Sequence, residues 1–222
     1  MMSAPRRAVD LRCCLVTSGT GDRAVETAAR AAAAGAGVVQ VRAKEATARG
    51  LMELARQVAR AVAAASPRTR VLVNDRADVA WALARQGEAV HGVHLGQDDL
   101  PARDARALLG PRALIGMTAG TLPLVRRAQD LAGDIDYLGA GPFRPTPTKP
   151  SRRVPLGVGG YRDLVAASAL PIVAIGNVRP DDVPALAATG VAGTAMVRAI
   201  MAAPDPAVEV RRCLAGWSVP QD

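Results

Sequence analysis

Eight short apolar runs alternate with longer, Ala- and Arg-rich amphipathic runs along the 222 residues of this chain. A short apolar run is typical of a buried strand, and an amphipathic run is typical of a helix. Their regular alternation predicts parallel strands joined by right-handed crossovers. Eight such units in about 200 residues predict closure into a single (β/α)8 TIM barrel. An open, doubly wound sheet is the alternative, but no Gly-x-Gly-x-x-Gly turn follows the first predicted strand.

The predicted elements run from Arg12 to Leu214. Strands are predicted at Arg12–Thr17, Val38–Arg42, Arg70–Asn74, Gly92–Leu95, Ala113–Met117, Tyr137–Ala140, Pro171–Ile175 and Gly193–Val197. Helices are predicted at Arg23–Ala34, Ala46–Ala65, Ala77–Arg85, Pro101–Leu109, Leu122–Leu131, Tyr161–Ala167, Pro180–Ala188 and Ala207–Leu214.

We expect one TIM-barrel domain over residues 11–216, between a flexible N-terminus at 1–10 and a C-terminal tail at 217–222. One connection is unusually long, Gly141–Gly160 between the sixth strand and its helix, and it is rich in Pro, Thr, Gly and basic residues. A long loop in a compact barrel is more often a functional lid than a defect. Barrel active sites lie at the carboxyl ends of the strands, so we expect the functional residues there.

The net charge of +8 is carried almost wholly by arginine. These arginines are spread over the predicted helices, with no stacking aromatics or motif, which argues against a nucleic-acid partner. No window holds the 18 uninterrupted apolar residues that a membrane span needs, and we expect a cytoplasmic protein without a membrane partner. Cys13 and Cys14 should point to opposite faces of one strand and Cys213 is distant, so no structural disulfide is expected. The sequence does not indicate the oligomeric state.

The second predicted strand ends in polar residues that share one face. Period-two alternation sends Gln40, Arg42 and Lys44 to one side and Val39 and Val41 to the other. A cation inside a barrel is costly unless it is paired. We interpret Gln40 as meeting a neutral polar group, and Arg42 and Lys44 as meeting a polyanion. The alternative is a structural ion pair at the barrel mouth.

Carboxylates follow the next two strands. Asn74 and Asp75 end the third strand, and Asp98 and Asp99 lie just beyond the fourth. Two carboxylates converging from adjacent loops suit a hard cation, and we predict a Mg²⁺ site. The alternative role of either aspartate is a helix N-cap.

Hydroxyls and a lysine follow the fifth and sixth strands. Thr118 could donate to a phosphate or cap the following helix. Thr146, Thr148 and Lys149 lie on one short Pro-rich segment and form a plausible anion clamp.

The last two strands end in a pattern typical of phosphate sites. Gly176 and Asn177 follow the seventh strand, and Val197 and Arg198 follow the eighth. Loops at these positions of a barrel commonly bind a phosphate through backbone N–H groups. His91 and His94 lie at period-two spacing on strand four, but no third ligand is evident for zinc, and we expect one of them to pack inside the barrel.

Four of these strand-end motifs resemble the thiamine phosphate synthase family in both order and spacing. They are Gln-Val-Arg-Ala-Lys at 40–44, Asn-Asp-Arg at 74–76, Gly-Val-His-Leu-Gly-Gln-Asp-Asp at 92–99 and Gly-Pro-Phe-Arg-Pro-Thr-Pro-Thr-Lys at 141–149. The resemblance spans roughly Leu11 to Leu214. It implies an enzyme that joins hydroxymethylpyrimidine diphosphate to thiazole phosphate, giving thiamine phosphate and diphosphate.

The resemblance also implies a role for each matched residue. The pyrimidine diphosphate would be held by Gln40, Arg42, Lys44, Asn74, Thr118 and Lys149. Mg²⁺ would be held by Asp75 and Asp99. The thiazole phosphate would be held by Thr146, Thr148, Gly176, Asn177, Val197 and Arg198.

Three positions depart from the family pattern. Thr118 stands where the family usually has Ser, and it keeps the hydroxyl. Asn177 stands where a second Gly is usual; Asn tolerates a left-handed backbone, but its side chain could crowd the phosphate. Arg198 stands where many members have Ser, and it could still face an anion.

The implied chemistry needs charge neutralisation and positioning. A diphosphate leaves readily once its charge is neutralised, and the thiazole nitrogen attacks without losing a proton. This agrees with a sequence that has no catalytic-triad pattern. One alternative is the sister thiazole tautomerase. It typically has a histidine beside the hydroxyl after strand five and lacks the aspartate-bearing Gly-Gln-x-Asp turn. The other alternative is a non-catalytic barrel that senses a thiamine precursor. This chain has Met117 before Thr118 and keeps Asp99, against the tautomerase, while Asn177 keeps the sensor open.

Overall fold

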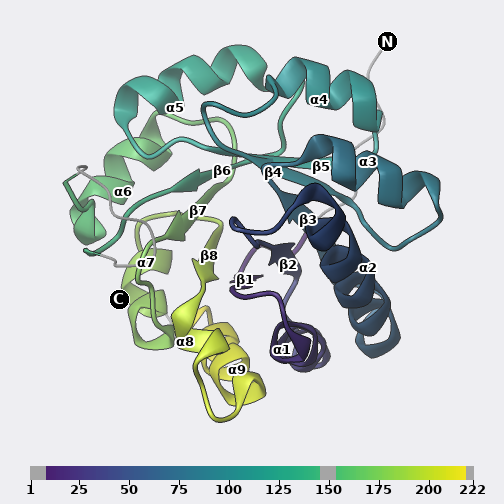
Figure 1. The fold of residues 1–222 in the computed structure, drawn as a ribbon. Coiled ribbons are helices and arrows are strands. Elements are labelled where there is room, and N and C mark those ends of the chain that lie inside the picture. The colour runs from purple at the N-terminus through teal and green to yellow at the C-terminus, as the bar shows by residue number, and fades with distance from the viewer. Residues whose placement is uncertain (1–8, 146–153, 219–222) are drawn as a thin grey trace.

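The computed structural model describes residues 9–145 and 154–218, in which eight parallel strands close into one barrel (Figure 1). The strands are β1 (Cys13–Val16), β2 (Val38–Val41), β3 (Arg70–Asn74), β4 (Gly92–Leu95), β5 (Leu114–Thr118), β6 (Tyr137–Ala140), β7 (Ile172–Ile175) and β8 (Gly193–Met196). Each strand pairs with its neighbour in the sequence, and β1 pairs with β8 to close the barrel. The predicted (β/α)8 fold is confirmed, and each predicted strand end lies within one residue of the observed end.

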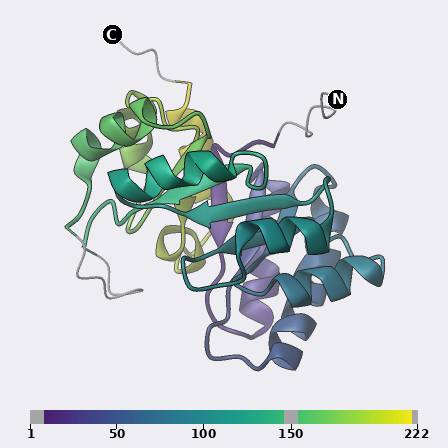
Figure 2. The ribbon, with the colours of Figure 1, turned by 90° about the horizontal axis from the view of Figure 1, so that it is seen from above.

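Helices surround the strands as an outer ring (Figure 1). They are α1 (Asp22–Ala33), α2 (Ala48–Ala65), α3 (Ala77–Arg85), α4 (Ala102–Leu109), α5 (Leu122–Ala128), α6 (Gly157–Ala166), α7 (Val183–Ala187), α8 (Arg198–Met201) and α9 (Pro206–Gly216), with 3-10 turns η1 (Gln129–Leu131) and η2 (Pro180–Asp182). The purple first part of the chain and the yellow last part lie side by side, where β1 pairs with β8 and α1 contacts α9 (Figure 2). No helix within these described ranges is both long and apolar enough to cross a membrane.

The barrel has two apolar layers because successive strand residues point to opposite sides. Val39 and Val41 of β2 are fully buried in the layer between strands and helices. The inner layer contains Cys14, Val16 and Tyr137. Cys13 belongs to the outer layer and Cys14 to the inner one, as the alternation predicts, and both are buried free thiols.

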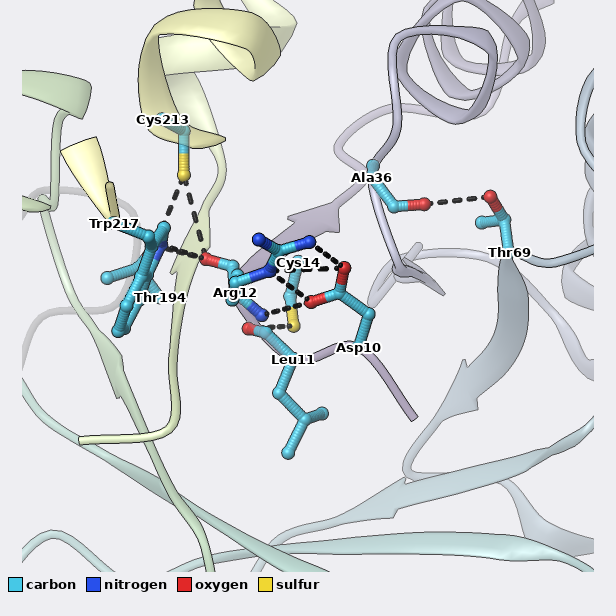
Figure 3. Close-up of polar contacts among 9 residues, drawn as sticks. All are labelled: Asp10, Leu11, Arg12, Cys14, Ala36, Thr69, Thr194, Cys213 and Trp217. Carbon is cyan, nitrogen blue, oxygen red and sulfur yellow. Dashed lines mark hydrogen bonds and ion pairs between the residues drawn. The ribbon is translucent and has the colours of Figure 1, made fainter. Parts of the chain in front are cut away.

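The carbonyl of Arg12 fastens the last helix to the first strand at the amino-terminal end of the barrel (Figure 3). It accepts hydrogen bonds from Trp217 Nε1 at 2.9 Å, Thr194 Oγ1 at 2.9 Å and Cys213 Sγ at 3.6 Å. The indole and the thiol come from the C-terminal part of the chain, and the hydroxyl comes from β8. These contacts tie both ends of the barrel domain together, on the side opposite to the carboxyl ends of the strands.

Two helical segments differ from the sequence prediction. Helix α6 begins at Gly157, four residues before the predicted start, so residues 157–160 are not part of the long loop. Glycine disfavours helix intrinsically, but Tyr161 and Leu164 are buried on this helix and their packing overrides that preference. Helix α8 was not predicted, because a four-residue helix is too short to show a period of 3.6.

Candidate active site

The carboxyl ends of the strands surround one cavity of about 720 Å³. Every predicted site residue within the described ranges lines it, namely Gln40, Arg42, Lys44, Asn74, Asp75, Asp99, Thr118, Gly176, Asn177, Val197 and Arg198. Thr146, Thr148 and Lys149 lie outside the described residues. Positions as distant in the sequence as Gln40 and Arg198 therefore meet at one site.

The floor of the cavity combines an apolar surface with one pair of amides. Val16, Val173 and Ala195 contribute apolar surface. Gln40 Nε2 donates to Asn74 Oδ1 at 2.5 Å, and both side chains are buried. Gln40 thus meets a neutral polar group, as the sequence predicted, and the two amides fix each other's orientation.

Two cations extend from β2 along one side of the cavity. The backbone N–H of Arg42 donates to Thr17 Oγ1 at 3.0 Å, which anchors the chain just after the strand. Lys44 Nζ lies 3.8 Å from Asp75 Oδ2, with 45% of the lysine side chain exposed. The contact is long and half-solvated, so it is a weak ion pair that leaves the ammonium accessible from the cavity.

Asp75 and Asp99 approach each other at the mouth of the cavity. Burial raises the pKa of Asp75, and the charge and hydrogen bonding of Asp99 raise it further, against the opposing charges of Lys44 and Arg42. Asp99 Oδ2 also accepts from the backbone N–H of Gly96 at 2.6 Å, which fixes its turn. The two carboxylates thus meet at a mutual electrostatic cost.

Neither aspartate has the alternative role of a helix cap. The N-cap of α3 is Arg76 and that of α4 is Pro101. Asp75 adopts φ of 65°, a left-handed conformation that is uncommon outside glycine. Strain and charge repulsion at one position are typical of functional sites rather than of structural ones.

The donor set fits Mg²⁺. Two carboxylates that repel each other supply hard oxygen ligands, and a divalent cation between them would remove the repulsion. Among the described residues, no group of three or more His, Cys, Asp and Glu side chains could hold a metal. Mg²⁺ commonly binds one or two carboxylates and fills its other positions with water and substrate phosphate oxygens.

Thr118 of β5 takes part in a hydrogen-bonded chain that joins three strands. Its Oγ1 lies 3.1 Å from His94 Nε2, and His94 Nδ1 lies 2.9 Å from the hydroxyl of Tyr137. Gln97 Nε2 donates to the Thr118 carbonyl at 2.5 Å. The N-cap position of helix α5 is Thr121, so Thr118 does not have the alternative capping role.

His94, Tyr137 and Gln97 line the cavity but were not predicted as site residues. Their pairing crosses from β4 to β6, and no local sequence pattern reports such a contact. One signal was available at Gly116 of β5, which lies between these strands. A Cβ at this glycine would lie 2.2 Å from Cζ of Tyr137, so the tyrosine ring occupies the space of the missing side chain.

The far end of the cavity is built by the turns after β7 and β8. Gly176 has φ of 101°, and a Cβ there would lie 2.6 Å from Cα of Pro142, so only glycine fits. Asn177 has φ of 61°, and its Nδ2 donates to the Pro145 carbonyl at 3.0 Å. Arg198 Nη2 donates to Asn177 Oδ1 at 3.1 Å. The amide of Asn177 is therefore engaged by neighbouring protein groups.

An ion-pair cluster that was not predicted completes this end. Arg212 contacts Asp181 at 2.6 Å and Glu209 at 3.0 Å, and all three line the outer cavity. Both partners of Arg212 are acidic, whereas Arg198 contacts a neutral amide. These two cavity arginines therefore differ in how far the protein itself neutralises their charge.

Together, the fold and cavity define a (β/α)8-barrel protein whose polar cavity, at the carboxyl ends of the strands, is suited to a small charged molecule. Residues 13–200 match the family model described as thiamine monophosphate synthase. The chain belongs to the thiamine phosphate synthase family, and it is a transferase of thiamine biosynthesis that forms thiamine phosphate.

Individual relatives agree along nearly the whole chain. The thiamine-phosphate synthase of Corynebacterium jeikeium is 59% identical over 198 residues, which are 89% of this chain and 90% of the relative. That of Corynebacterium efficiens is 56% identical over 209 residues, 94% and 95% of the two chains. The solved structure of thiamine phosphate pyrophosphorylase from Pyrococcus furiosus superposes with a TM-score of 0.78 at 29% identity, covering 94% of this chain and 96% of that one.

Proposed function

We propose that the chain binds the pyrimidine diphosphate at the β2–β5 side of the cavity and thiazole phosphate at the β7–β8 side, and that diphosphate departs before the thiazole attacks. The main support is the meeting of a carboxylate pair with the cations of Arg42 and Lys44 in one cavity. A diphosphate and a divalent cation together satisfy both sets of charges.

Asp75 and Asp99 are the proposed Mg²⁺ ligands. When bound, Mg²⁺ would withdraw negative charge from the leaving diphosphate. Lys44 lies beside Asp75, so its ammonium is suited to contact the same diphosphate. Arg42 adds a second cation on the same wall of the cavity, where it stabilises charge that develops as the bond breaks.

The pyrimidine ring is proposed to lie on the cavity floor. The paired amides of Gln40 and Asn74 offer donors and acceptors to ring nitrogens and to the exocyclic amine. Val16, Val173 and Ala195 exclude water from the ring face. Water exclusion matters because a pyrimidinylmethyl cation would otherwise be captured by hydroxide or water.

Diphosphate departure breaks the bond between the methylene carbon and its oxygen, and both electrons leave with that oxygen. The aminopyrimidine delocalises the positive charge that remains on the methylene group. The thiazole nitrogen then donates its lone pair to that carbon, and no proton has to be removed. The protein's task is therefore orientation and charge stabilisation, without a general base.

The second substrate is proposed to place its phosphate at the turns of Gly176, Asn177, Val197 and Arg198. The left-handed turn after β7 and the adjacent guanidinium of Arg198 are suited to an anion. Lys149 for the diphosphate and Thr146 and Thr148 for the thiazole phosphate are assigned by family resemblance alone. The proposed cytoplasmic location agrees with three free cysteines.

The test is turnover with both substrates. The protein is mixed with the pyrimidine diphosphate, thiazole phosphate and Mg²⁺, and release of diphosphate is followed with formation of thiamine phosphate. We expect both products in equal amounts, and loss of both on chelation of the metal. Binding of both substrates without any diphosphate release would contradict the proposal and favour a sensor. Isomerisation of a thiazole precursor would favour the tautomerase.

A further inference from the structure

Tyr137, His94 and Thr118 form a continuous hydrogen-bonded chain that ends at the cavity. The distances are 2.9 Å from Tyr137 Oη to His94 Nδ1 and 3.1 Å from His94 Nε2 to Thr118 Oγ1. All three residues line the cavity, and Tyr137 is only 4% exposed. Which group donates in each of these two hydrogen bonds decides whether the Thr118 hydroxyl can donate its proton to a substrate.

The phenol of Tyr137 sets that direction. Burial raises the pKa of Tyr137 well above its usual range, so the hydroxyl keeps its proton. Among the contacts of the described residues, the phenolic oxygen is paired with His94 Nδ1. A phenol that donates to this nitrogen keeps its buried O–H hydrogen-bonded, and Nδ1 is then the acceptor.

The tautomer of the His94 imidazole then determines the direction of its hydrogen bond with Thr118. A neutral imidazole that accepts at Nδ1 carries its proton on Nε2. The Nε2–H then donates to Thr118 Oγ1, which leaves the threonine O–H directed elsewhere. Accepting one hydrogen bond also strengthens the hydroxyl as a donor of the next.

We propose that His94 and Tyr137 are positioning residues that hold Thr118 as a hydrogen-bond donor toward the diphosphate of the first substrate. This inference rests on the proposed function of the cavity. Without the tyrosine hydroxyl, Nδ1 loses this hydrogen-bond donor, and the Nδ1–H tautomer gains population. Thr118 could then donate to His94 instead of to the substrate.

Close packing restricts the orientation of the His94 and Tyr137 rings. Their centroids are 5.5 Å apart. A Cβ at Gly139 would lie 2.9 Å from Cε1 of His94, and a Cβ at Gly116 would lie 2.2 Å from Cζ of Tyr137. The two glycines leave the space that the rings fill, so neither ring can turn freely. This close packing is what a tautomer-setting contact requires.

The kinetic test uses the two tyrosines of the chain as a matched pair. Tyr137→Phe should lower kcat/KM for the pyrimidine diphosphate about tenfold, with KM for thiazole phosphate unchanged. Tyr161→Phe is the control. It also removes one buried hydroxyl, which donates to the Ala140 carbonyl at 2.9 Å, but Tyr161 does not line the cavity. This variant should keep both kinetic constants within about twofold.

Variants of Thr118 show whether the tyrosine acts through it. Thr118→Val should cost more than Tyr137→Phe, and adding Tyr137→Phe to Thr118→Val should have no further effect on kcat/KM. Thr118→Ser keeps the hydroxyl and should restore most of the kcat/KM that Thr118→Val loses. A full additional loss in the double variant would overturn the proposal, because the tyrosine would then act independently of Thr118.

A substrate-free measurement separates this inference from the proposed function. The chain has two histidines, so ¹⁵N-histidine labelling gives two imidazole patterns, which His91→Gln assigns. We expect His94 to be the Nε2–H tautomer, and Tyr137→Phe to introduce the Nδ1–H form while Tyr161→Phe does not. A wild-type His94 that is protonated on Nδ1 would overturn the inference even in an active enzyme. The expected tautomers in an inactive protein would instead contradict the proposed function alone.

Discussion

Arg198 Nη2 donates to Asn177 Oδ1 at 3.1 Å, so the two residues that replace the usual Ser and Gly of the family contact each other. Asn177 also donates to the Pro145 carbonyl, which links the turns after β6, β7 and β8. The two departures are therefore one structural unit. These two hydrogen bonds fix the orientation of the Asn177 amide beside the proposed phosphate site.

This contact predicts coupled effects on the second substrate. Arg198→Ser should raise KM for thiazole phosphate about five- to tenfold, since it removes a cation from the phosphate site. Asn177→Gly should raise it less, and the double variant should resemble Arg198→Ser, because Asn177 acts by orienting the guanidinium. Arg212→Ser is the control, since its charge is already neutralised by Asp181 and Glu209. Independent, additive effects in steady-state kinetics would refute the coupling.

Removing one charge of the carboxylate pair should lower activity without lowering stability. Asp75→Asn should lower turnover by about two orders of magnitude at ordinary Mg²⁺ concentrations. Without metal, the same variant should have a Tm equal to or above that of the wild type, because the repulsion by Asp99 is gone. Asparagine is chosen because it tolerates the left-handed backbone at this position better than alanine. A marked fall in Tm would indicate a structural role instead.

His91 predicts a loss of stability on mild acidification. Its Nδ1 accepts from the Val71 N–H at 3.0 Å, and burial, with the charge of Arg70, lowers the pKa of His91 to about 4. The unfolded chain takes up this proton at about pH 6.5. The contribution to folding is thus complete above about pH 6.5 and declines as the pH falls toward 4.

Urea unfolding between pH 7 and 5 measures this decline. His91→Gln should show a flatter dependence of the free energy of unfolding on pH over that range than the wild type. Parallel curves for the two proteins would show that His91 does not titrate differently in the folded state.

Trp217 predicts a stability effect that is separate from catalysis. Trp217→Phe removes the indole hydrogen bond to the Arg12 carbonyl and should lower the free energy of unfolding by about 1 kcal/mol. The kcat should be unchanged, since this contact lies at the opposite end of the barrel from the cavity. Trp81→Phe is the control, because that ring is 43% exposed on α3. An equal loss in both variants, measured by denaturant titration, would argue against the proposed anchoring.

The fold was predictable from the sequence because its signal repeats in every unit. Runs such as Val38–Val41 alternate with helices such as Ala48–Ala65, and each strand end was predicted to within one residue. The gathering of Gln40, Asp75 and Asp99 followed from topology alone, since parallel strands in a barrel bring their carboxyl ends together.

The rest of the site depends on contacts between strands that no local pattern reports. His94 and Tyr137 are 43 residues apart and meet only because β4 and β6 flank the side-chain-free position of Gly116. The contact of Arg198 with Asn177 likewise joins two turns that were predicted separately. Such pairings require the actual barrel geometry.

Calorimetric titration with inorganic diphosphate tests the central claim most directly, because it probes the charge arrangement without requiring turnover. We predict tight binding in the presence of Mg²⁺, weak binding in the presence of EDTA, and weak binding to Asp75→Asn and Asp99→Asn under either condition. Equal affinity in all these cases would contradict the assignment of the two carboxylates to a metal that holds the diphosphate.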